Sequence, residues 1–569
     1  MRPVSGGVEG AAGHSQLSTG SAARGCSRRA FVSAASLAVA GIAIGARRLS
    51  AAELATGIAP NALMPDPMDA AGLRALATAA IDAARSAGAT YADVRVGASQ
   101  RFSLGKTGGA LGFWAAGDVL FGFGIRALVG GRWGFVHGDV ASADAVATAA
   151  RGAAAQGKNG AGATSAGAEY APAGAVTGEW RTPMVIDPFA VPLHEQMALI
   201  QSWLDTMAGV RGLDSRPSVA WQREVRVFAS TEGSLITQHF GRIDPDFDIS
   251  GTRMMGGETV EIKVPSFYAM AGGYEAMARE SIHEEIKATA EDVRRMASLE
   301  ARTLDVGRYP VVLDGMTFGS LLFSTVGRAL ELDRALGEEA DASGTSYLAP
   351  PASIVGTPVF SPVLNVSTDR ALPSVTSAKW DDEGVEPETG PVIKGGALVD
   401  YETSRQAAST LQPWYHRQSR PVASRGRAVA TACDQAVQIR CGHLTVTHAR
   451  AAATIDDLIR GIPRGLLVRG GYQISTDQQL TTGNVDAFGG ALILQVEKGR
   501  VVRRVRNVGL EWSTLPFLKT LAAVGDASTV AHATGESYKG VPWHGAPYHT
   551  TAPAGLFTEV RVVEIGGAI

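Results

Sequence analysis

The stretch VVLDGMTFGSLLFSTVGRALELDRALGEEADASGTSYLA, residues 311–349, decides how the fold of this chain is interpreted. Its first four residues, VVLD, have the apolar character of a short buried strand. The apolar residues after them recur at helical spacing, which predicts a helix over roughly residues 316–336. That helix carries the charged pattern L-E-x-D at residues 330–333, and Gly344-Thr345-Ser346 follows it.

The patterns before and after this stretch differ, and they predict two domains of an α+β protein. Before it, amphipathic segments at 69–87, 142–156, 191–209 and 275–303 predict helices, and strand patterns occur at 91–98, 119–129, 133–137, 225–230 and 233–240. After it, short strand patterns bounded by glycine dominate, at residues 466–470, 491–497, 500–508 and 555–563. We therefore expect an N-terminal α/β-layer domain over residues 53–305 and a β-rich, barrel-like C-terminal domain over residues 306–569.

The first 52 residues have the pattern of a twin-arginine export signal. Arg28 and Arg29 precede an apolar run from Phe31 to about Gly45, and small residues follow near Ser50. The run is about 15 residues, short of the roughly 20 that span a bilayer. We expect a periplasmic or secreted protein without a stable membrane span.

Composition excludes several functional classes. The chain has 569 residues, a formal net charge of −3 and three cysteines. A near-neutral chain lacks the basic field of most nucleic-acid-binding proteins, and three cysteines cannot build a disulfide-dense scaffold. Outside the signal, Cys433 and Cys441 could pair in an oxidising compartment or remain buried thiols, and the sequence leaves both open.

Several common catalytic motifs are missing from the sequence. The pairs His194-Glu195 and His283-Glu284 lack the second histidine of the zinc-binding motif HExxH. The G-x-S-x-G nucleophile elbow and the Rossmann glycine motif are absent.

Residues 311–349 resemble the core motif of the TldD/PmbA family, also called TldD/TldE. Other segments resemble this family in the same order: YADVRV at 91–96, GFGIRALVGGRWGFVHGD at 122–139, the strand at 225–233, WDDEG at 380–384, GG at 470–471, GNV at 483–485 and GLFTEVRVVE at 555–564. The resemblance covers about residues 70–565. It implies a zinc metallopeptidase scaffold that forms dimers and admits peptides to an enclosed cavity.

At the zinc-binding motif the sequence departs from the family. Catalytic members carry HExxxH on the helix and a later cysteine as third ligand, whereas the six positions here are Phe323-Ser324-Thr325-Val326-Gly327-Arg328. A phenyl ring has no lone pair for zinc, a guanidinium is cationic, and Ser324 has no carboxylate to act as a base. The cysteine position aligns with Ser537. We therefore expect no zinc and no catalytic residue here.

The spacing of HExxxH also carries a structural expectation. Residues five apart lie about 140° apart on a regular α-helix, so two ligands share a face only if the helix is locally distorted.

Other polar residues support weaker hypotheses. Glu331 and Asp333 could hold the helix in the domain, with Glu331 pairing to Arg328, or they could shape a peptide-binding cleft. His544 and His549, in a segment expected to be a loop, could build a relocated metal site, and His443 and His448 beside Cys441 pose a similar question. The acidic run Asp381-Asp382-Glu383 could bind calcium, although a solvated turn is the simpler interpretation.

The resemblance and the lost motif together suggest a family member that acts as a non-catalytic partner or peptide-binding subunit. It would work as a homodimer, or as a heterodimer with another TldD/PmbA-type subunit. An active peptidase with a relocated site and a cell-envelope assembly protein are the alternatives.

Overall fold

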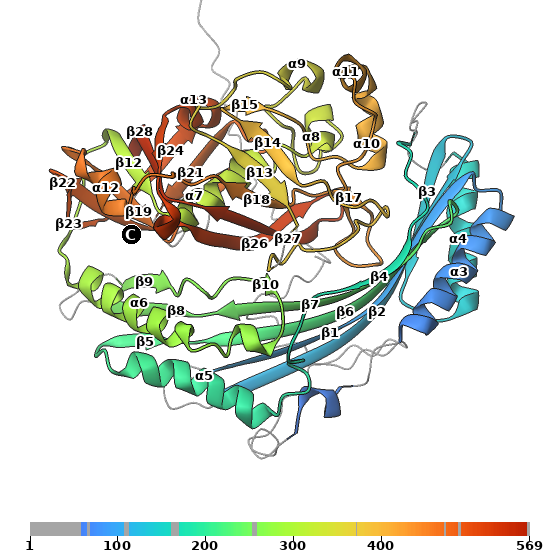
Figure 1. Cartoon of the computed structure of the whole chain (residues 1–569), viewed down its shortest axis with the longest axis horizontal. Coiled ribbons are helices and arrows are strands. Elements are labelled where there is room, and N and C mark those ends of the chain that lie inside the picture. Colours follow the sequence, from blue (N-terminus) through green and yellow to red (C-terminus); the bar gives the residue numbers. More distant parts are fainter. Residues whose placement is uncertain are drawn as a thin grey trace, which may run out of the picture. The chain divides into compact units, whose positions relative to one another are not determined.

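The computed structural model describes residues 58–64, 69–106, 113–160, 170–252, 259–370, 373–471, 474–486 and 491–565. The signal predicted for residues 1–52 lies outside this part of the chain. Among the described helices, none is long and apolar enough to cross a membrane. The predicted α+β class is confirmed, because helices combine with several separate sheets (Figure 1).

The N-terminal half is built on a seven-stranded sheet. Its strand order is β10-β7-β6-β1-β2-β3, and β4 pairs with β7 in parallel. The strands are β1 (Tyr91–Lys106), β2 (Phe113–Val129), β3 (Arg132–Gly138), β4 (Thr177–Arg181), β6 (Ser218–Ser230), β7 (Leu235–Asp246) and β10 (Met270–Ala271). The predicted hairpin between β2 and β3 is confirmed, and its turn residues Gly130 and Gly131 both have positive φ, as a type I′ turn requires.

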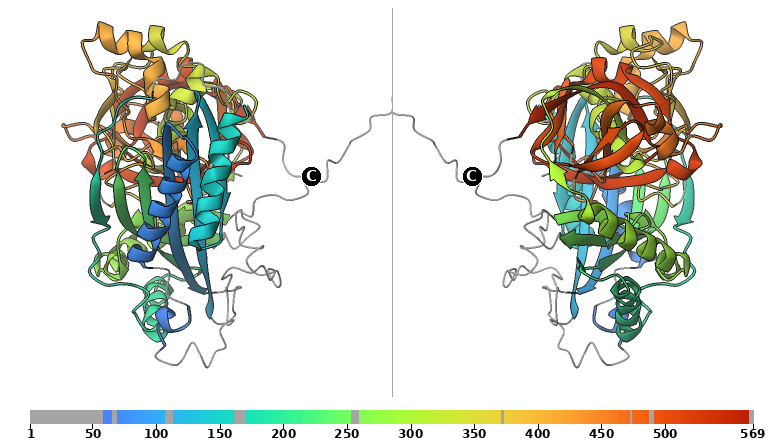
Figure 2. Two further views of the ribbon diagram at one scale, coloured as in Figure 1. Left: turned by 90° about the vertical axis from the view of Figure 1, so that its right-hand side faces the viewer. Right: turned by 90° about the vertical axis from the view of Figure 1, so that its left-hand side faces the viewer.

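Helices lie on this sheet in two separate groups. The helices α3 (Ala70–Ser86) and α4 (Ala143–Lys158) pack side by side against β1, β2 and β6, as Figure 2 shows. The helices α5 (Leu193–Ala208) and α6 (Ser281–Ser298) share a second core with the three-stranded sheet β5 (Leu213–Ser215), β8 (Asp248–Thr252) and β9 (Thr259–Lys263). The helix α6 is shorter than the helix predicted over residues 275–303. Tyr274–Ala276 forms a separate 3₁₀ turn before it, and α6 ends at Ser298.

The C-terminal half contains a ten-stranded and a six-stranded sheet. The larger has the order β11-β23-β22-β19-β12-β28-β24-β21-β20, with β25 paired to β28, and the smaller has the order β15-β14-β13-β18-β27-β26. Both are open sheets with edge strands in the described residues, so the barrel-like closure that we expected is not found. The larger sheet comprises β11 (Ala301–Arg302), β12 (Gly307–Leu313), β19 (Arg464–Arg469), β20 (Ser475–Thr476), β21 (Thr482–Asp486), β22 (Leu492–Glu497), β23 (Arg500–Val505), β24 (Val508–Ser513), β25 (Leu521–Val524) and β28 (Gly555–Glu564).

The smaller sheet supplies most of the strands near the candidate site. It comprises β13 (Val366–Asp369), β14 (Gly390–Lys394), β15 (Ala397–Leu398), β18 (His443–Val446), β26 (Ala531–Lys539) and β27 (His544–Ala552). Short elements complete this half: α8 (Leu332–Leu336), α9 (Pro351–Ile354), α10 (Arg405–Thr410), α11 (Gln412–Arg417), α12 (Ile455–Arg460), α13 (Thr514–Lys519) and the pair β16 (Ala428–Val429) and β17 (Gln438–Ile439).

The helix α7 (Gly315–Leu322) lies between these two sheets (Figure 1). On one side a side chain at Gly319 would stand 3.1 Å from the Cβ of Ala533 on β26, so glycine permits this close approach. On the other side Phe318 packs edge-on against Phe557 of β28, with ring centroids 5.6 Å apart. The helix that leads into residues 323–328 is therefore at the centre of the C-terminal core.

The acidic run at residues 381–383 joins the two halves. Asp382 accepts hydrogen bonds from Arg226 of β6 at 3.0 Å, and Glu383 pairs with Arg126 of β2 at 3.1 Å. Asp381 accepts backbone N–H bonds, and burial, together with the charge of Glu383, raises its pKa to about 7. All three carboxylates are buried, so the interpretation as a solvated turn was wrong.

Candidate functional site

The helix at the candidate site does not continue regularly through residues 316–336 as predicted. Asp314 caps α7 by accepting a hydrogen bond from the Thr317 backbone N–H at 2.8 Å. After Leu322 the chain forms a π-helical turn over Phe323–Gly327, and α8 begins only at Leu332. The expected distortion at the HExxxH positions is therefore present.

The π turn connects Phe323 and Arg328, the residues that the resemblance aligns with the two histidines of HExxxH. The backbone N–H of Arg328 donates to the carbonyl oxygen of Phe323, five residues earlier, at 3.1 Å. A wider turn brings residues five apart closer to one face than an α-helix would. The turn at these residues is therefore of the wider kind that the spacing of HExxxH calls for.

Phe323, which the resemblance aligns with the first histidine of HExxxH, is part of the core. Its side chain is buried and stacks on Tyr548 of β27, with ring centroids 3.8 Å apart and planes within 5°. This aromatic pair joins the π turn to the six-stranded sheet through dispersion and burial of apolar surface. The helix and the strand are therefore held together here by this aromatic contact.

Arg328, which the resemblance aligns with the second histidine of HExxxH, brings a positive charge. Its Nη1 donates to the hydroxyl of Thr476 on β20 at 2.9 Å. Burial, and then the nearby guanidinium groups of Arg334 and Arg440, lower the pKa of Arg328 to about 10. The group remains protonated at neutral pH and repels a divalent cation.

Glu331 and Asp333 point into a buried ion cluster. The Nζ of Lys539 on β26 lies 3.0 Å from Glu331 and 2.6 Å from Asp333, and Glu331 also accepts from Arg334 at 2.9 Å. Burial opposes ionisation of Glu331, but Lys539 and Arg334 hold its pKa at about 2. These contacts support the hypothesis that both residues hold the helix in the domain. The predicted pair of Glu331 with Arg328 is not formed, because Glu331 pairs with Arg334 and Lys539.

Ser537 lies on the face of β26 that is turned toward the helix. Strand alternation places it on the same side as Ala533, which approaches Gly319, and Lys539, which pairs with Glu331. This placement agrees with the alignment of Ser537 to the cysteine that the resemblance implies as the third zinc ligand. A hydroxyl there lacks the thiolate that binds zinc strongly.

His544 and His549 are not in a loop. Both belong to β27, which pairs with β26 in an antiparallel hairpin. Residues five apart on a strand point to opposite faces, so the two imidazoles do not converge. The prediction of a loop was wrong because the glycine and proline residues of this segment are accommodated within paired strands.

His549 instead belongs to a histidine cluster that the sequence analysis missed. His532 Nδ1 lies 3.0 Å from His549 Nε2, and His443 stacks on His549 with centroids 4.1 Å apart. Asp369 contacts His443 at 3.1 Å, and Tyr268 stacks on His532 at 4.2 Å. These side chains come from four adjacent strands, β13, β18, β27 and β26, and from the segment before β10. Only strand pairing brings them together, so no local spacing indicates the cluster.

The cysteines take no part in this cluster. Cys433 and Cys441 are buried free thiols, and the backbone N–H of Cys441 donates to Glu331. His448 is exposed and contacts the neighbouring Ala449 carbonyl. Within the described residues no group of three or more His, Cys, Asp or Glu side chains is arranged to hold a metal ion.

The chain matches models of a known protein family and is similar to several curated proteins. A family model described as the PmbA/TldA metallopeptidase C-terminal domain matches residues 306–564, and a model of PmbA/TldA metallopeptidase domain 1 matches residues 92–156. A metalloprotease from Methanothermobacter thermautotrophicus is 25% identical over 441 residues, which is 76% of this chain and 88% of that protein. A metalloprotease from Archaeoglobus fulgidus is 22% identical over 70% of this chain and 83% of its own length.

Solved structures show the same fold. The chain resembles TldE from Thermococcus kodakarensis with a TM-score of 0.61 and 16% identity, over 85% of this chain and 99% of that one. A protein from Thermotoga maritima, described as a proposed modulator of a DNA gyrase, gives a TM-score of 0.64 at 16% identity, over 86% and 99% of the two chains. At this level of identity the likeness concerns the fold alone.

Proposed function

Because the chain belongs to the TldD/PmbA family of metallopeptidases, we propose that it is a non-catalytic member that binds peptides or supports a catalytic partner. The observation that carries this proposal is the stack of Phe323 on Tyr548, which fills the first ligand position with a buried aromatic pair. Arg328 adds a fixed positive charge at the second position, and Ser324 supplies no carboxylate base. Since a catalytic zinc site normally needs three protein ligands, the segment has lost both the metal and the base.

Elemental analysis of the purified chain tests this proposal. We expect the wild-type protein to carry only trace zinc and to leave unfolded peptides intact. A matched variant carries Phe323→His, Ser324→Glu, Arg328→His and Ser537→Cys. These four substitutions introduce the HExxxH residues on the existing π turn and the cysteine on β26. This variant should gain near-stoichiometric zinc if the backbone is suited to ligation, with circular dichroism verifying that it is folded. A wild-type chain that carries near-stoichiometric zinc and cleaves unfolded peptides would overturn the proposal.

The proposal includes export by the twin-arginine route and assembly with a second subunit. Support for export comes from the arginine pair Arg28-Arg29 before the apolar run. We expect the substitution of both arginines by lysine to retain the chain in the cytoplasm, as measured by cell fractionation and immunoblotting. The second arginine pair, Arg47-Arg48, follows the apolar run, so its replacement by two lysines is the matched charge-preserving control and should leave export unchanged. Equal export of all three proteins would contradict this part of the proposal.

A further inference from the structure

A row of polar side chains crosses the six-stranded sheet. Its members come from four neighbouring strands, β13, β18, β27 and β26, and are Asp369, His443, Thr551 and His532. Thr550, the residue before Thr551, faces α7, because a side chain at Gly319 would stand 3.6 Å from its Cβ. Strand alternation therefore points Thr551 to the opposite face of the sheet. The row is thus on the face turned away from the degenerate zinc position.

Two hydrogen bonds join a hydroxyl, an imidazole and a carboxylate within this row. Thr551 Oγ1 lies 2.8 Å from His443 Nε2, and His443 Nδ1 lies 3.1 Å from Asp369 Oδ1. An ionised carboxylate only accepts hydrogen bonds, so in the neutral imidazole the proton is on Nδ1 and the lone pair is on Nε2. The Thr551 hydroxyl then donates its proton toward His443.

The ring of His443 is also held by a neighbouring imidazole. His549 stacks on it with centroids 4.1 Å apart and an interplanar angle of 16°. The three residues Asp369, His443 and Thr551 are each half-buried, so they are not sealed in the core. A hydroxyl that donates to an imidazole, which a carboxylate orients in turn, is the arrangement that activates a hydroxyl nucleophile. Such a triad is recognised by geometry and not by the order of its residues in the sequence.

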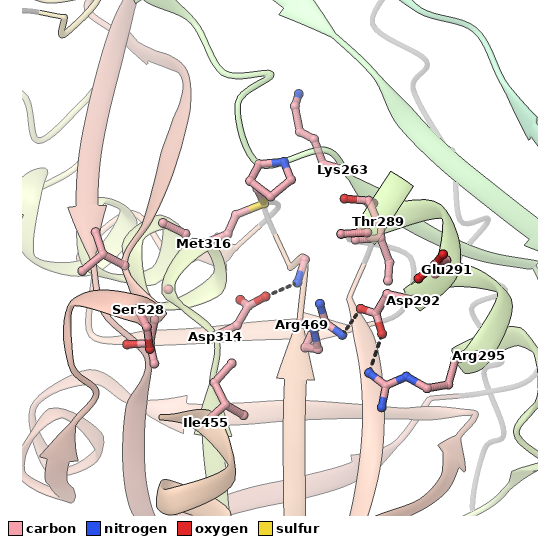
Figure 3. Close-up of a pocket in the computed structure, with 18 of the residues that line it drawn as sticks. Lys263, Thr289, Glu291, Asp292, Arg295, Asp314, Met316, Ile455, Arg469 and Ser528 are labelled. Carbon is pink, nitrogen blue, oxygen red and sulfur yellow. Dashed lines mark hydrogen bonds and ion pairs between the residues drawn. The ribbon is translucent and has the colours of Figure 1, made fainter. Parts of the chain in front are cut away.

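Open space reaches the end of the sheet beside this row. A cavity of about 950 Å³ lies between α6 and the beginning of α7, and residues 528–531 form part of its wall (Figure 3). Ala531 is the residue before His532 and pairs with Ala552, the residue after Thr551. One strand position corresponds to about 3.3 Å. Space for a small organic molecule is therefore found next to the pair of Thr551 and His532.

We propose that Thr551 is a nucleophile that accepts an acyl group from an ester, with His443 as its base and Asp369 as a positioning residue. Thr551 Oγ1 attacks the carbonyl carbon while its proton moves to His443 Nε2. The bond from this carbon to the alcohol oxygen then breaks, and His443 returns the proton to the departing alkoxide. Water, deprotonated by the same imidazole, releases the carboxylic acid and restores the hydroxyl.

The surroundings of Thr551 favour esters over amides as substrates. The strand β27 pairs with β26 on one side and with β18 on the other, so the backbone N–H groups beside Thr551 serve the sheet and form no oxyanion hole. An ester, whose alcohol leaves more readily than an amine, suits such a site. The inference goes beyond the proposed function, because the chain is then non-catalytic only at the zinc position.

Reaction with 4-nitrophenyl acetate at about pH 7.5, with EDTA present, tests the proposal. We expect the full chain to release a burst of about one equivalent of 4-nitrophenolate, and peptide mass spectrometry to find the acetyl group on Thr551. Thr551→Val keeps the shape of the side chain without the hydroxyl and should lose the burst, whereas Thr551→Ser should keep it. Thr445→Val is the matched control, because Thr445 pairs with Thr551 on the adjacent strand and is also half-buried. It should react like the wild type.

Variants of the other two residues separate catalysis from folding. His443→Gln should slow the burst by roughly 100-fold or more. Asp369→Asn should slow it by roughly tenfold or more, because an amide can also donate a hydrogen bond and so favours the wrong tautomer of His443. Asp369→Glu should recover part of the rate, with circular dichroism verifying that each variant is folded.

Two results would rule the triad out. One is acetylation of other residues with none on Thr551, and the other is an equal burst from the wild type and Thr551→Val. Since EDTA is present throughout, neither result depends on bound zinc, and the zinc test of the proposed function is decided separately.

Discussion

Replacing Lys539 by methionine should lower the free energy of unfolding by about 3–5 kcal/mol. The Lys539 ammonium is fully buried and pairs with both Glu331 and Asp333. Methionine has a similar length but no charge. The carboxylates of Glu331 and Asp333 would then stay buried with one positive charge fewer beside them. The measurement is the midpoint and slope of denaturant unfolding, in which the slope should stay constant.

Two further variants make this result specific. Lys287→Met, at an exposed position of α6, should change the free energy of unfolding by no more than about 0.5 kcal/mol. Adding Glu331→Gln to Lys539→Met should recover part of the loss, because one of the uncompensated buried charges is then removed. A loss below about 1 kcal/mol for Lys539→Met would show that the cluster contributes little to stability.

The second large effect concerns acid pH and the histidine cluster. Burial, followed by the charges of the neighbouring histidines, lowers the pKa of His532 to about 4 and that of His549 to about 2. In the unfolded chain both return to about 6.5, so the folded state binds fewer protons. The stabilisation is present above the unfolded pKa and is lost as the pH falls toward the folded values. At about pH 5 the loss is on the order of 2 kcal/mol for each histidine.

Comparison with a variant isolates this contribution from other titrating groups. Asp381, whose pKa is raised by burial to about 7, has the opposite pH dependence, but it contributes equally to the wild type and to a histidine variant. Between about pH 7.5 and pH 5 the wild type should therefore lose on the order of 2 kcal/mol more than His532→Gln. His194→Gln, at an exposed position of α5, should follow the wild type. Parallel stability curves for wild type and His532→Gln would disprove the assignment.

Local patterns in the sequence predicted those features that depend on neighbouring residues. The hairpin of β2 and β3 followed from its Gly-Gly turn, and the strand before the motif helix followed from its apolar run. A local distortion of the helix, which the structure shows to be a π turn, followed from the five-residue spacing of the family motif.

Features that depend on long-range pairing could not be predicted in this way. Lys539 lies 208 residues after Glu331, and only the placement of β26 beside the helix makes the pair. His443, His532 and His549 converge because β18, β27 and β26 are neighbours, which periodicity does not indicate. The acidic run at residues 381–383 was interpreted as solvated because its arginine partners lie in a different half of the chain.

The aromatic pair at the π turn has a consequence for the order in which a zinc site could arise here. Phe323→His would forfeit the contact with Tyr548, while a lone imidazole holds no zinc. A route that begins with Phe323→His therefore loses this contact before any zinc is bound.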